Sequence, residues 1–453
     1  MSAPSSRNGS GTADATGHIH LGLWLTYLST AGWVAPDSRA EEVNSLEPYA
    51  DIALAAEAAG LDAVIRGDGL RSPSGLREDS PHAGSLELVT LLAALAARTS
   101  RIGLIGTAST TFSEPYNLAR QFATLDHLSG GRIGWNIVTS AGGEKNFGID
   151  ELPGQDERYS RADEFVDVVG ALWDSWEPGS VPVDREHRVF VHPEGVHPID
   201  HAGEHFRVEG PLNVSRSPQG RPVHVQAGSS ERGRQFAARH AEVVFTAQQH
   251  LDEAVAFASD IRRRVTEAGR DASQVKILPG IGLYLGETEE EARTAYEAEL
   301  ELIDYDDARA RLEDLLGGAD LSGIDLDDRV PPERFPDTSR LTRRQSRPQI
   351  FVDLAVAHGQ TLRTVLQAVA GGFGHGRFVG TPEQAADHLI AWADAGAADG
   401  YVVFPSGGWR TIELLTEQLV PILRERGRFR HGYEGTTLRE HFGLAPVTTG
   451  DGT

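Results

Sequence analysis

Residues 102–138, IGLIGTASTTFSEPYNLARQFATLDHLSGGRIGWNIV, decide the fold class because they contain one complete strand–helix–strand unit. An apolar strand is predicted at 102–106, and an amphipathic helix at 114–127 that ends at the glycine pair 130–131. A further strand follows at 132–138. Strands that are joined through a helix need a crossover connection and lie parallel in one sheet. The stretch therefore predicts an α/β protein built on a parallel sheet.

The same alternation extends in both directions from this unit and covers most of the chain. Strands are predicted at 20–26, 61–66, 102–106, 132–138, 222–227, 242–246, 275–285 and 401–404. Helices are predicted at 45–59, 86–98, 114–127, 157–176, 231–240, 252–268, 382–395 and 411–426, with Ser45 and Ser85 as the N-caps of the first two. Eight strands separated by helices favour a (β/α)₈ TIM barrel over an open doubly wound sheet.

Two long interruptions, at about 177–221 and 304–377, exceed an ordinary loop and are interpreted as insertions in the barrel. The second insertion is rich in charge and proline, and its sequence fits a mobile lid, a partner-binding segment or plain surface decoration equally well. The small and polar residues 1–17 predict a disordered N-terminal tail, and 446–453 a flexible C-terminal tail. The remaining residues, 18–445, are expected to form a single barrel domain.

Composition excludes several classes of function. The 42 Lys and Arg residues against 66 Asp and Glu residues give a net charge of −24, which disfavours binding to nucleic acid or anionic lipid. The absence of cysteine excludes disulfides, thiolate zinc sites, iron–sulfur clusters and a cysteine nucleophile. No apolar run reaches the ~18 residues of a membrane span, and no secretory signal is present, so we expect a soluble, cytoplasmic protein. The 17 histidines form no metal-binding motif, and no metal is expected.

Candidate functional residues lie where predicted strands end, which is where TIM barrels carry their active sites. Asp68, in the segment RGDG, is suited to accept from a ligand N–H or to cap the next turn. Thr107 and Ser109 belong to a hydroxyl cluster, TASTT, that suits hydrogen bonding to a polar heterocycle. Asn136 alternates with Trp135 along its strand, so a buried amide there needs a ligand or a neighbouring barrel side chain as its partner.

A candidate anion site follows the fifth predicted strand. Gly228, Ser229 and Ser230 directly precede a helix, and backbone N–H groups with hydroxyls at a helix N-terminus can bind a phosphate. The alternative is that Ser230 is a plain N-cap. Tyr159, at the start of the fourth predicted helix, could add a hydroxyl to the same phosphate, and the neighbouring Arg158 could add a charge or form a surface salt bridge.

Several long segments together resemble one known family. They are GLDAVIRGDGL at 60–70, EPYNLARQFATLDHLSGGRIGWNIVTSAGGEKNFG at 114–148, ERYSRADEFVDVVGALWDSW at 157–176, residues 201–238, VGTPEQAADHL at 379–389 and YEGTTLREHFGL at 433–444. The sequence resembles the bacterial-luciferase-like flavin monooxygenases, in the class that includes nitrilotriacetate and dibenzothiophene sulfone monooxygenases. These segments span nearly the whole predicted domain.

The resemblance implies a TIM barrel that binds FMN as FMNH₂, supplied by a separate NAD(P)H-dependent flavin reductase. It implies that O₂ reacts with the flavin to give a C4a-peroxide, which oxygenates a small organic substrate, and that the protein forms a homodimer or homotetramer. The residues that would contact FMN are Asp68, Thr107, Ser109, Asn136, Tyr159, Gly228, Ser229 and Ser230. Among relatives the substrate varies, and the residues that select it are expected in the two insertions.

The candidate catalytic residues are Trp24, Asn136 and Gln155. Trp24 fits either a wall of the active site or core packing. Gln155 stands where the family often has histidine, and an amide cannot carry a proton at neutral pH. The segment Arg66–Asp68 also differs from the usual Leu-Ala-Asp. The alternatives are a deazaflavin-dependent oxidoreductase of the same superfamily, a catalytically silent flavin-binding protein whose second insertion plugs the barrel, and a barrel hydrolase or aldolase that uses no flavin.

Overall fold

The computed structural model describes residues 17–26, 33, 38–71, 86–140, 142–341, 346–372 and 374–448. The predicted N-terminal tail up to residue 16, the predicted cap Ser85 and residues 449–453 of the predicted C-terminal tail lie outside these ranges. All eight predicted strands lie inside them.

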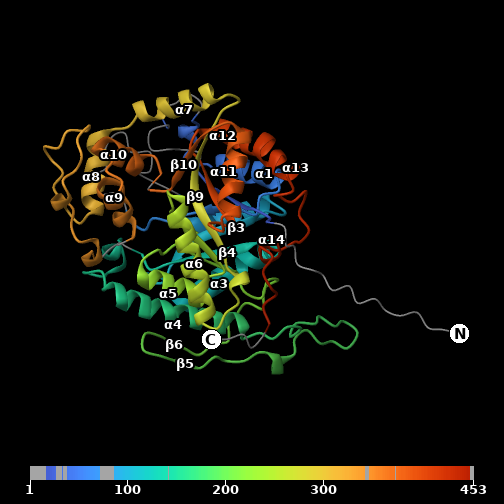
Figure 1. Ribbon diagram of the computed structural model, residues 1–453. Coiled ribbons are helices and arrows are strands. Elements are labelled where there is room, and N and C mark those ends of the chain that lie inside the picture. The colour runs from blue at the N-terminus through green and yellow to red at the C-terminus, as the bar shows by residue number, and fades with distance from the viewer. Residues whose placement is uncertain are drawn as a thin grey trace.

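Eight parallel strands close into a barrel (Figure 1), which confirms the predicted TIM barrel. The strands are β1 (His20–Trp24), β2 (Ala63–Arg66), β3 (Gly103–Ser109), β4 (Ile133–Val138), β7 (Val223–Gln226), β8 (Val243–Thr246), β9 (Lys276–Leu285) and β11 (Gly400–Pro405). Their order around the barrel is β9-β11-β1-β2-β3-β4-β7-β8, and the pairing of β8 with β9 closes it. All carboxyl ends therefore meet at one end of the barrel, which we call the mouth.

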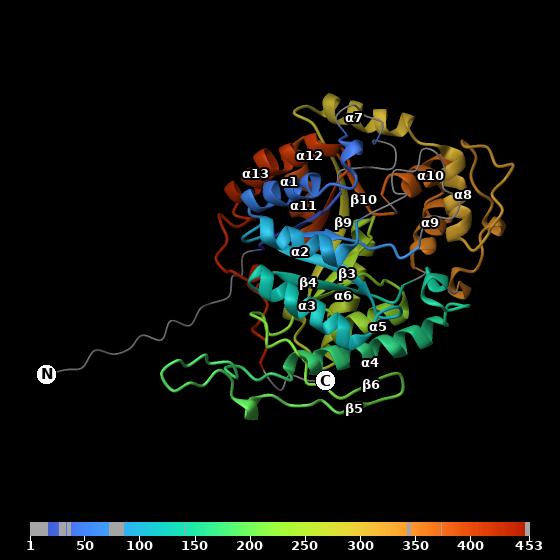
Figure 2. The same ribbon diagram turned by 180° about the vertical axis from the view of Figure 1, so that it is seen from behind.

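Helices connect these strands and cover the outside of the barrel (Figure 2). They are α1 (Glu47–Ala58), α2 (Leu88–Arg98), α3 (Pro115–Ser129), α4 (Gln155–Asp174), α5 (Glu231–His240), α6 (Leu251–Glu267), α7 (Glu289–Glu301), α11 (Pro382–Asp394), α12 (Gly408–Leu414) and α13 (Val420–Glu425). The predicted start of α2 is two residues early, because Glu87 accepts hydrogen bonds from the N–H groups of Val89 and Thr90 and so caps the helix. The N-cap of α1 is Leu46 rather than Ser45.

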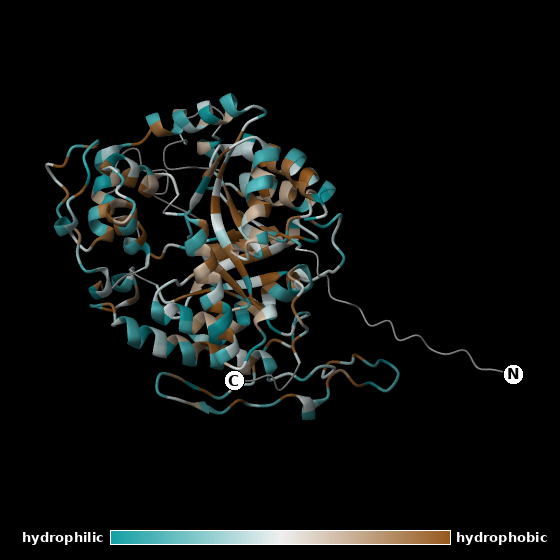
Figure 3. Ribbon diagram, viewed as in Figure 1, coloured by the Kyte–Doolittle hydropathy of each residue, from teal (hydrophilic) through white to brown (hydrophobic). Residues whose placement is uncertain are grey.

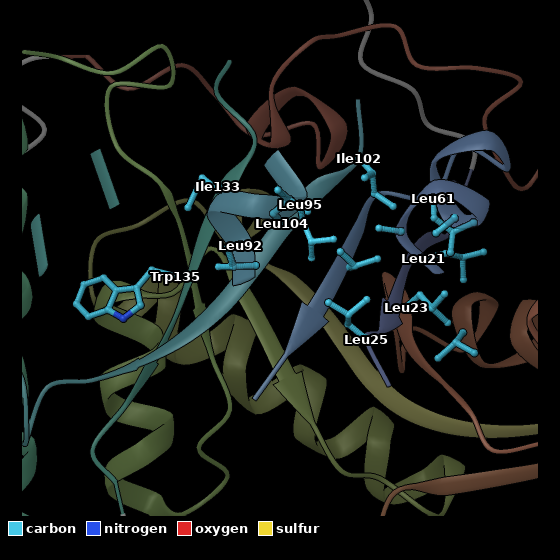
Figure 4. Packing of buried hydrophobic residues seen from close by; sticks show 14 of the residues in the cluster. Leu21, Leu23, Leu25, Leu61, Leu92, Leu95, Ile102, Leu104, Ile133 and Trp135 are labelled. Carbon is cyan, nitrogen blue, oxygen red and sulfur yellow. The ribbon is translucent and has the colours of Figure 1, made fainter. Parts of the chain in front are cut away.

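The strands are apolar on both faces, because one face meets the helices and the other faces the barrel interior (Figure 3). The helix-facing layer contains Leu92 of α2, Leu104 of β3 and Trp135 of β4 (Figure 4). Trp135 packs there against Phe165 and Trp173 of α4, so it is a core residue outside the barrel interior. Because side chains alternate between the two faces of β4, the next residue, Asn136, faces the barrel interior.

A ninth strand, β10 (Gly376–Gly380), was not predicted. It pairs in parallel with the second half of β9, at Ile281–Leu285, while β8 pairs with the first half. The first two residues of β10 fall within the predicted second insertion, 304–377. The strand was missed because it is short, begins and ends in glycine, and is only partly buried.

The two insertions differ in structure. Residues 177–221 form an extended excursion with a short hairpin, β5 (His201–Ala202) and β6 (Arg207–Val208), lying beside α4 in both views (Figures 1 and 2). The second insertion contains α8 (Tyr305–Leu315), α9 (Ser346–Val356) and α10 (Leu362–Ala370), which share a separate apolar cluster. Asp314 of α8 pairs with Arg71 beyond β2, at 3.5 Å, so this helical unit reaches the loops of the mouth.

The opposite end of the barrel is closed by the C-terminal segment with α14 (Leu438–His441). Leu438 and Phe442 fill the barrel interior at this floor. Beside them Asp62, which is fully buried, pairs with Arg430 and accepts from the Leu21 N–H at 2.7 Å. Burial alone would raise the pKa of Asp62, but the charges of Arg430 and His20 outweigh it and hold that pKa below its usual range.

We predict that Arg430→Met destabilises the fold by about 3–5 kcal/mol, because it leaves the Asp62 carboxylate buried without its cation. The ion pair stabilises the folded state above the unfolded pKa of about 3.9. The difference between wild type and variant therefore begins to shrink as the pH falls below about 4, and it continues to shrink towards the lower folded-state pKa, in denaturant titrations. Arg426→Met is the matched control, since it removes an exposed pair with Asp387 worth at most about 1 kcal/mol. Equal losses in both variants would contradict this account.

Candidate functional site

The polar side of the mouth is built from β2, β3 and β4. Asn136 Nδ2 donates to Thr107 Oγ1 at 2.8 Å, and Thr107 Oγ1 donates to the Arg66 carbonyl at 3.2 Å. Thr107 and Asn136 are register partners and both are buried. Asn136 Oδ1 is buried and has no hydrogen-bond partner among the described residues. Thr107 thus pairs with the amide nitrogen of Asn136, whereas the amide oxygen is a buried acceptor that a ligand can use.

Ser109 organises the loop that follows β3. Its Oγ accepts from Ser140 Oγ at 2.7 Å and from the N–H groups of Thr111 and Phe112 at 3.2 Å each. These bonds fix the loop after β3 against the loop after β4.

Asp68 lies directly beyond β2, in a turn that borders a cavity. It accepts a hydrogen bond from the backbone of Gly69, as a turn residue does. It also lines a cavity of about 340 Å³ together with Glu87, Thr107, Ser109 and other residues of the β2–β4 side. Burial, and then the charge of Glu87, raises the pKa of Asp68. Asp68 therefore presents a carboxyl group to the cavity in surroundings that weaken its ionisation.

The residues predicted to bind a phosphate lie between β7 and α5. Ser230 is the N-cap of α5 and accepts from the Gly233 N–H at 3.1 Å and from Gln155 Nε2 at 3.3 Å. Ser229 Oγ lies 3.4 Å from Thr246 Oγ1 of β8. The role of Ser230 as an N-cap is compatible with a phosphate site, because an N-cap serine leaves the other N–H groups of the first turn available.

Gln155 and Tyr159, from the start of α4, both contact Ser230. Together with Gly228 and Ser229 these residues form what we call the hydroxyl cradle. Burial raises the pKa of Tyr159, while hydrogen bonds with Ser230 and Thr139 lower it in part. A Cβ on Gly228 would overlap Gln226 Nε2 and would lie 3.0 Å from the Tyr159 hydroxyl, so a larger residue there would require one of these side chains to move. The structure thus brings the predicted phosphate residues together.

Arg158 lies in the interior and not at the surface, where a salt bridge is the usual fate of such an arginine. It is buried and donates to the Pro153 carbonyl, which fixes the start of α4. Burial lowers its pKa.

The other side of the mouth is aromatic. Trp24 of β1 packs at 5.0 Å from Phe404 of β11 and at 6.0 Å from Phe245 of β8, measured between ring centroids. Trp24 is half-buried, so it lines the mouth and also packs against its neighbours. These three rings, which we call the aromatic wall, stand on strands across the barrel from Thr107 and Asn136.

Sequence reasoning missed three residues of the mouth. Phe245 and Phe404 lie at strand ends and could have been found by the rule that singled out Trp24. His375 stacks on both of them, at 5.0 and 4.7 Å. It could not have been placed, because it precedes the unpredicted strand β10.

Metal and membrane sites can also be assessed for the described part of the chain. Within it, no group of three or more His, Asp or Glu side chains is arranged to hold a metal ion. Among the same residues, none of the helices combines the length and the apolar character that crossing a bilayer requires.

Comparison with known proteins agrees with this geometry. The model of the luciferase-like monooxygenase family matches residues 25–399. The chain belongs to this family. It is 44% identical over 431 residues to N-acetyl-S-(2-succino)cysteine monooxygenase of Bacillus subtilis, covering 94% of this chain and 96% of that protein. It is 42% identical to nitrilotriacetate monooxygenase component A of Aminobacter aminovorans, covering 91% and 93%.

A solved structure of riboflavin lyase, described with modified FMN and riboflavin, superposes on this luciferase-like protein with a TM-score of 0.83. The two are 34% identical, with 95% of this chain and 96% of that chain covered. The resemblance expected from the sequence is confirmed, and the protein is a flavin-dependent monooxygenase.

We predict that Gly228→Ala destabilises this luciferase-like fold by about 1–3 kcal/mol, because the added methyl group must displace Gln226 or Tyr159. Chemical denaturation measures the loss. Gly432→Ala is the control, since a Cβ there has no atom within 4 Å and the expected change is within about 0.5 kcal/mol. An unchanged Gly228→Ala variant would show that the cradle is looser than these distances indicate.

Proposed function

We propose that this enzyme uses FMNH₂ and O₂ to transfer one oxygen atom to a small organic acid. One observation carries the proposal: a buried polar pair on β4 and β3 and a hydroxyl cradle after β7 stand on adjacent strands of one mouth. A flavin mononucleotide has a polar heterocycle at one end and a phosphate at the other. Two such sites side by side suit a ligand of that kind.

The ring end of FMN fits the polar side of the mouth. Asn136 Oδ1 is a buried acceptor without a partner among the described residues, which suits an N–H of the heterocycle. Thr107 and Ser109 supply hydroxyls beside it, and Asp68 lines the same cavity. The charged form of Asp68 is disfavoured by its surroundings, so its carboxyl group suits a neutral hydrogen-bonding partner.

The phosphate end fits the N-terminus of α5. Ser229, Ser230 and Tyr159 contribute hydroxyls, and the helix dipole favours an anion at this position. Gln155 donates to Ser230 and so orients the cradle. A positioning role for Gln155 agrees with its inability to carry a proton at neutral pH.

When bound, reduced flavin supplies the electrons with which O₂ is activated and one oxygen atom is transferred. The protein's part is to bind, orient and exclude water. Trp24, Phe245 and Phe404 present an apolar surface on the opposite side of the mouth, which keeps water from the reacting groups. Asn136 would bind the flavin ring through its buried Oδ1.

The relatives support the remaining parts of the proposal. The nitrilotriacetate enzyme is named as component A, which agrees with a separate NAD(P)H-dependent reductase as the source of FMNH₂. The first two relatives are named for substrates that carry several carboxylates, and this supports a small organic acid as substrate here. We also propose that the chain forms a homodimer or homotetramer.

The proposed reaction is tested with photoreduced FMN, ¹⁸O₂ and either N-acetyl-S-(2-succino)cysteine or nitrilotriacetate. We expect mass spectrometry to detect one ¹⁸O atom in the organic product or in its cleavage fragment. FMN binding without substrate-dependent incorporation would count against oxygen transfer to these acids. Binding of a deazaflavin in preference to FMN, with no oxygen consumed, would favour the deazaflavin alternative.

We predict that Ser230→Ala reduces the preference for FMN over riboflavin, which lacks the phosphate, by about tenfold. Fluorescence titration with both ligands gives the ratio of dissociation constants. Thr381→Ala is the matched control, because Thr381 caps α11 with the same type of side-chain bond and lies on the outer layer. Both variants should lose about 1 kcal/mol of stability from the missing cap, but only Ser230→Ala should change the ratio. A ratio unchanged in both would remove Ser230 from the phosphate site.

A further inference from the structure

The first insertion exposes an aromatic side chain in a turn at residues 183–190, which we call the projecting turn. The insertion extends away from the barrel in both views (Figures 1 and 2). Phe190 is 69% exposed, and Val183 at the other end of the turn is 44% exposed. Aromatic side chains are enriched where one protein binds another, and they supply many of the anchors of such interfaces.

Hydrogen bonds give the projecting turn a fixed shape. The Asp184 N–H donates to the Val189 carbonyl at 2.7 Å, and the Val189 N–H donates back to the Asp184 carbonyl at 2.9 Å. The Asp184 carboxylate accepts from the His187 N–H at 3.0 Å and lies 2.7 Å from Nδ1 of the same residue. The turn therefore presents Phe190 already ordered, so docking costs little conformational entropy.

The same insertion borders a hollow of about 410 Å³ between β6 and the first turn of α3. Its lining includes three apolar or aromatic residues and three exposed charged residues, namely Pro115, Tyr116 and Val208, and Glu114, Arg207 and Glu209. Apolar groups surrounded by charged ones are the usual anatomy of a protein-binding surface. The hollow has room for a phenyl ring.

The projecting turn carries two cations and one anion whose charges are not matched within the chain. Arg185, Glu186 and Arg188 are exposed, and within the described ranges none of the three has an ion-pair partner. Asp184 is engaged with His187. The turn therefore offers two guanidinium groups and one carboxylate to a partner.

The hollow carries the opposite set of charges. Glu114 and Glu209 supply two carboxylates and Arg207 one guanidinium, and none of them has an ion-pair partner in the part of the chain that the structure describes. With a net charge of −24, two copies of the chain repel each other, so self-association needs a local match of charge. Turn and hollow supply such a match, because each has the charges that the other lacks.

We propose that the projecting turn of one copy of this chain docks in the hollow of a second copy, with Phe190 as the anchor. Turn and hollow belong to the same chain, so the exchange is reciprocal and gives a two-fold dimer in which every contact occurs twice. The inference rests on the homodimer or homotetramer of the proposed function and names its interface. It needs neither the flavin nor the substrate.

The test compares wild type with Phe190→Ser, which removes the anchor, and Glu209→Arg, which reverses a charge of the hollow. Leu302→Ser and Glu301→Arg are the matched controls. They make the same kinds of change at exposed positions at the end of α7, on the opposite side of the molecule from β5 and β6 (Figures 1 and 2). Sedimentation velocity over a range of protein concentrations measures self-association, and thermal unfolding checks the fold of each variant.

We expect Phe190→Ser and Glu209→Arg each to weaken self-association by at least about 100-fold, because the two-fold axis repeats each lost contact. A dimer then becomes a monomer, or a tetramer a dimer. Both controls should associate as wild type does. All four substituted side chains are exposed, so unfolding should change little.

A mixture of the two variants tests whether the turn meets the hollow. In a mixed dimer, the intact turn of the Glu209→Arg copy faces the intact hollow of the Phe190→Ser copy, which restores one of the two contacts. Neither variant can form an intact contact with itself. Native mass spectrometry of an equimolar mixture should therefore show more mixed dimers than dimers of either variant alone.

Three results would overturn the interface: wild type does not self-associate, the two variants associate as tightly as wild type, or the mixture contains no excess of mixed dimers. Failure of the proposed function is measured separately, by titration of wild type and variants with FMN. Lack of FMN binding would overturn the cofactor assignment and leave the sedimentation result unaffected.

Discussion

The pairing of β8 with β9 closes the sheet, and the remaining features of the molecule depend on that closure. A closed parallel barrel places every carboxyl strand end at one mouth and every amino end at one floor. Residues that are more than a hundred positions apart, such as Thr107 and Phe245, then surround the same space. Without the closure, Phe245 on β8 and Phe404 on β11 would stand towards opposite ends of an open sheet, and the aromatic wall would not form.

The two ends of the barrel are built by different physical rules. The floor is filled by Leu438 and Phe442, and the charge of the buried Asp62 is matched by Arg430 within the protein. At the mouth, Asn136 Oδ1 is buried and has no partner among the described residues. The paired charges at the floor favour stability, whereas the acceptor at the mouth is a feature that a ligand can complete.

The second insertion adds to the mouth a component that the barrel strands do not contain. Its helices have their own apolar cluster, so they can hold a fixed shape while β10 fastens their end to β9. The glycine at 280 leaves room for His375 to enter between Phe245 and Phe404. The barrel strands and the second insertion are thus separate parts that meet at the mouth.

The sequence by itself determined the eight barrel strands, the helices between them and the strand-end positions of Asp68, Thr107, Asn136 and Ser230. These features depend on alternation and capping among near neighbours, which a linear pattern records. Only the tertiary structure decided the bond from Asn136 to Thr107, the contact of Gln155 with Ser230, the ion pair between residues 368 positions apart at Asp62 and Arg430, and the entry of His375 through β10. Each of these depends on strand register and barrel closure, which bring together residues whose local sequences carry no mark of the partner.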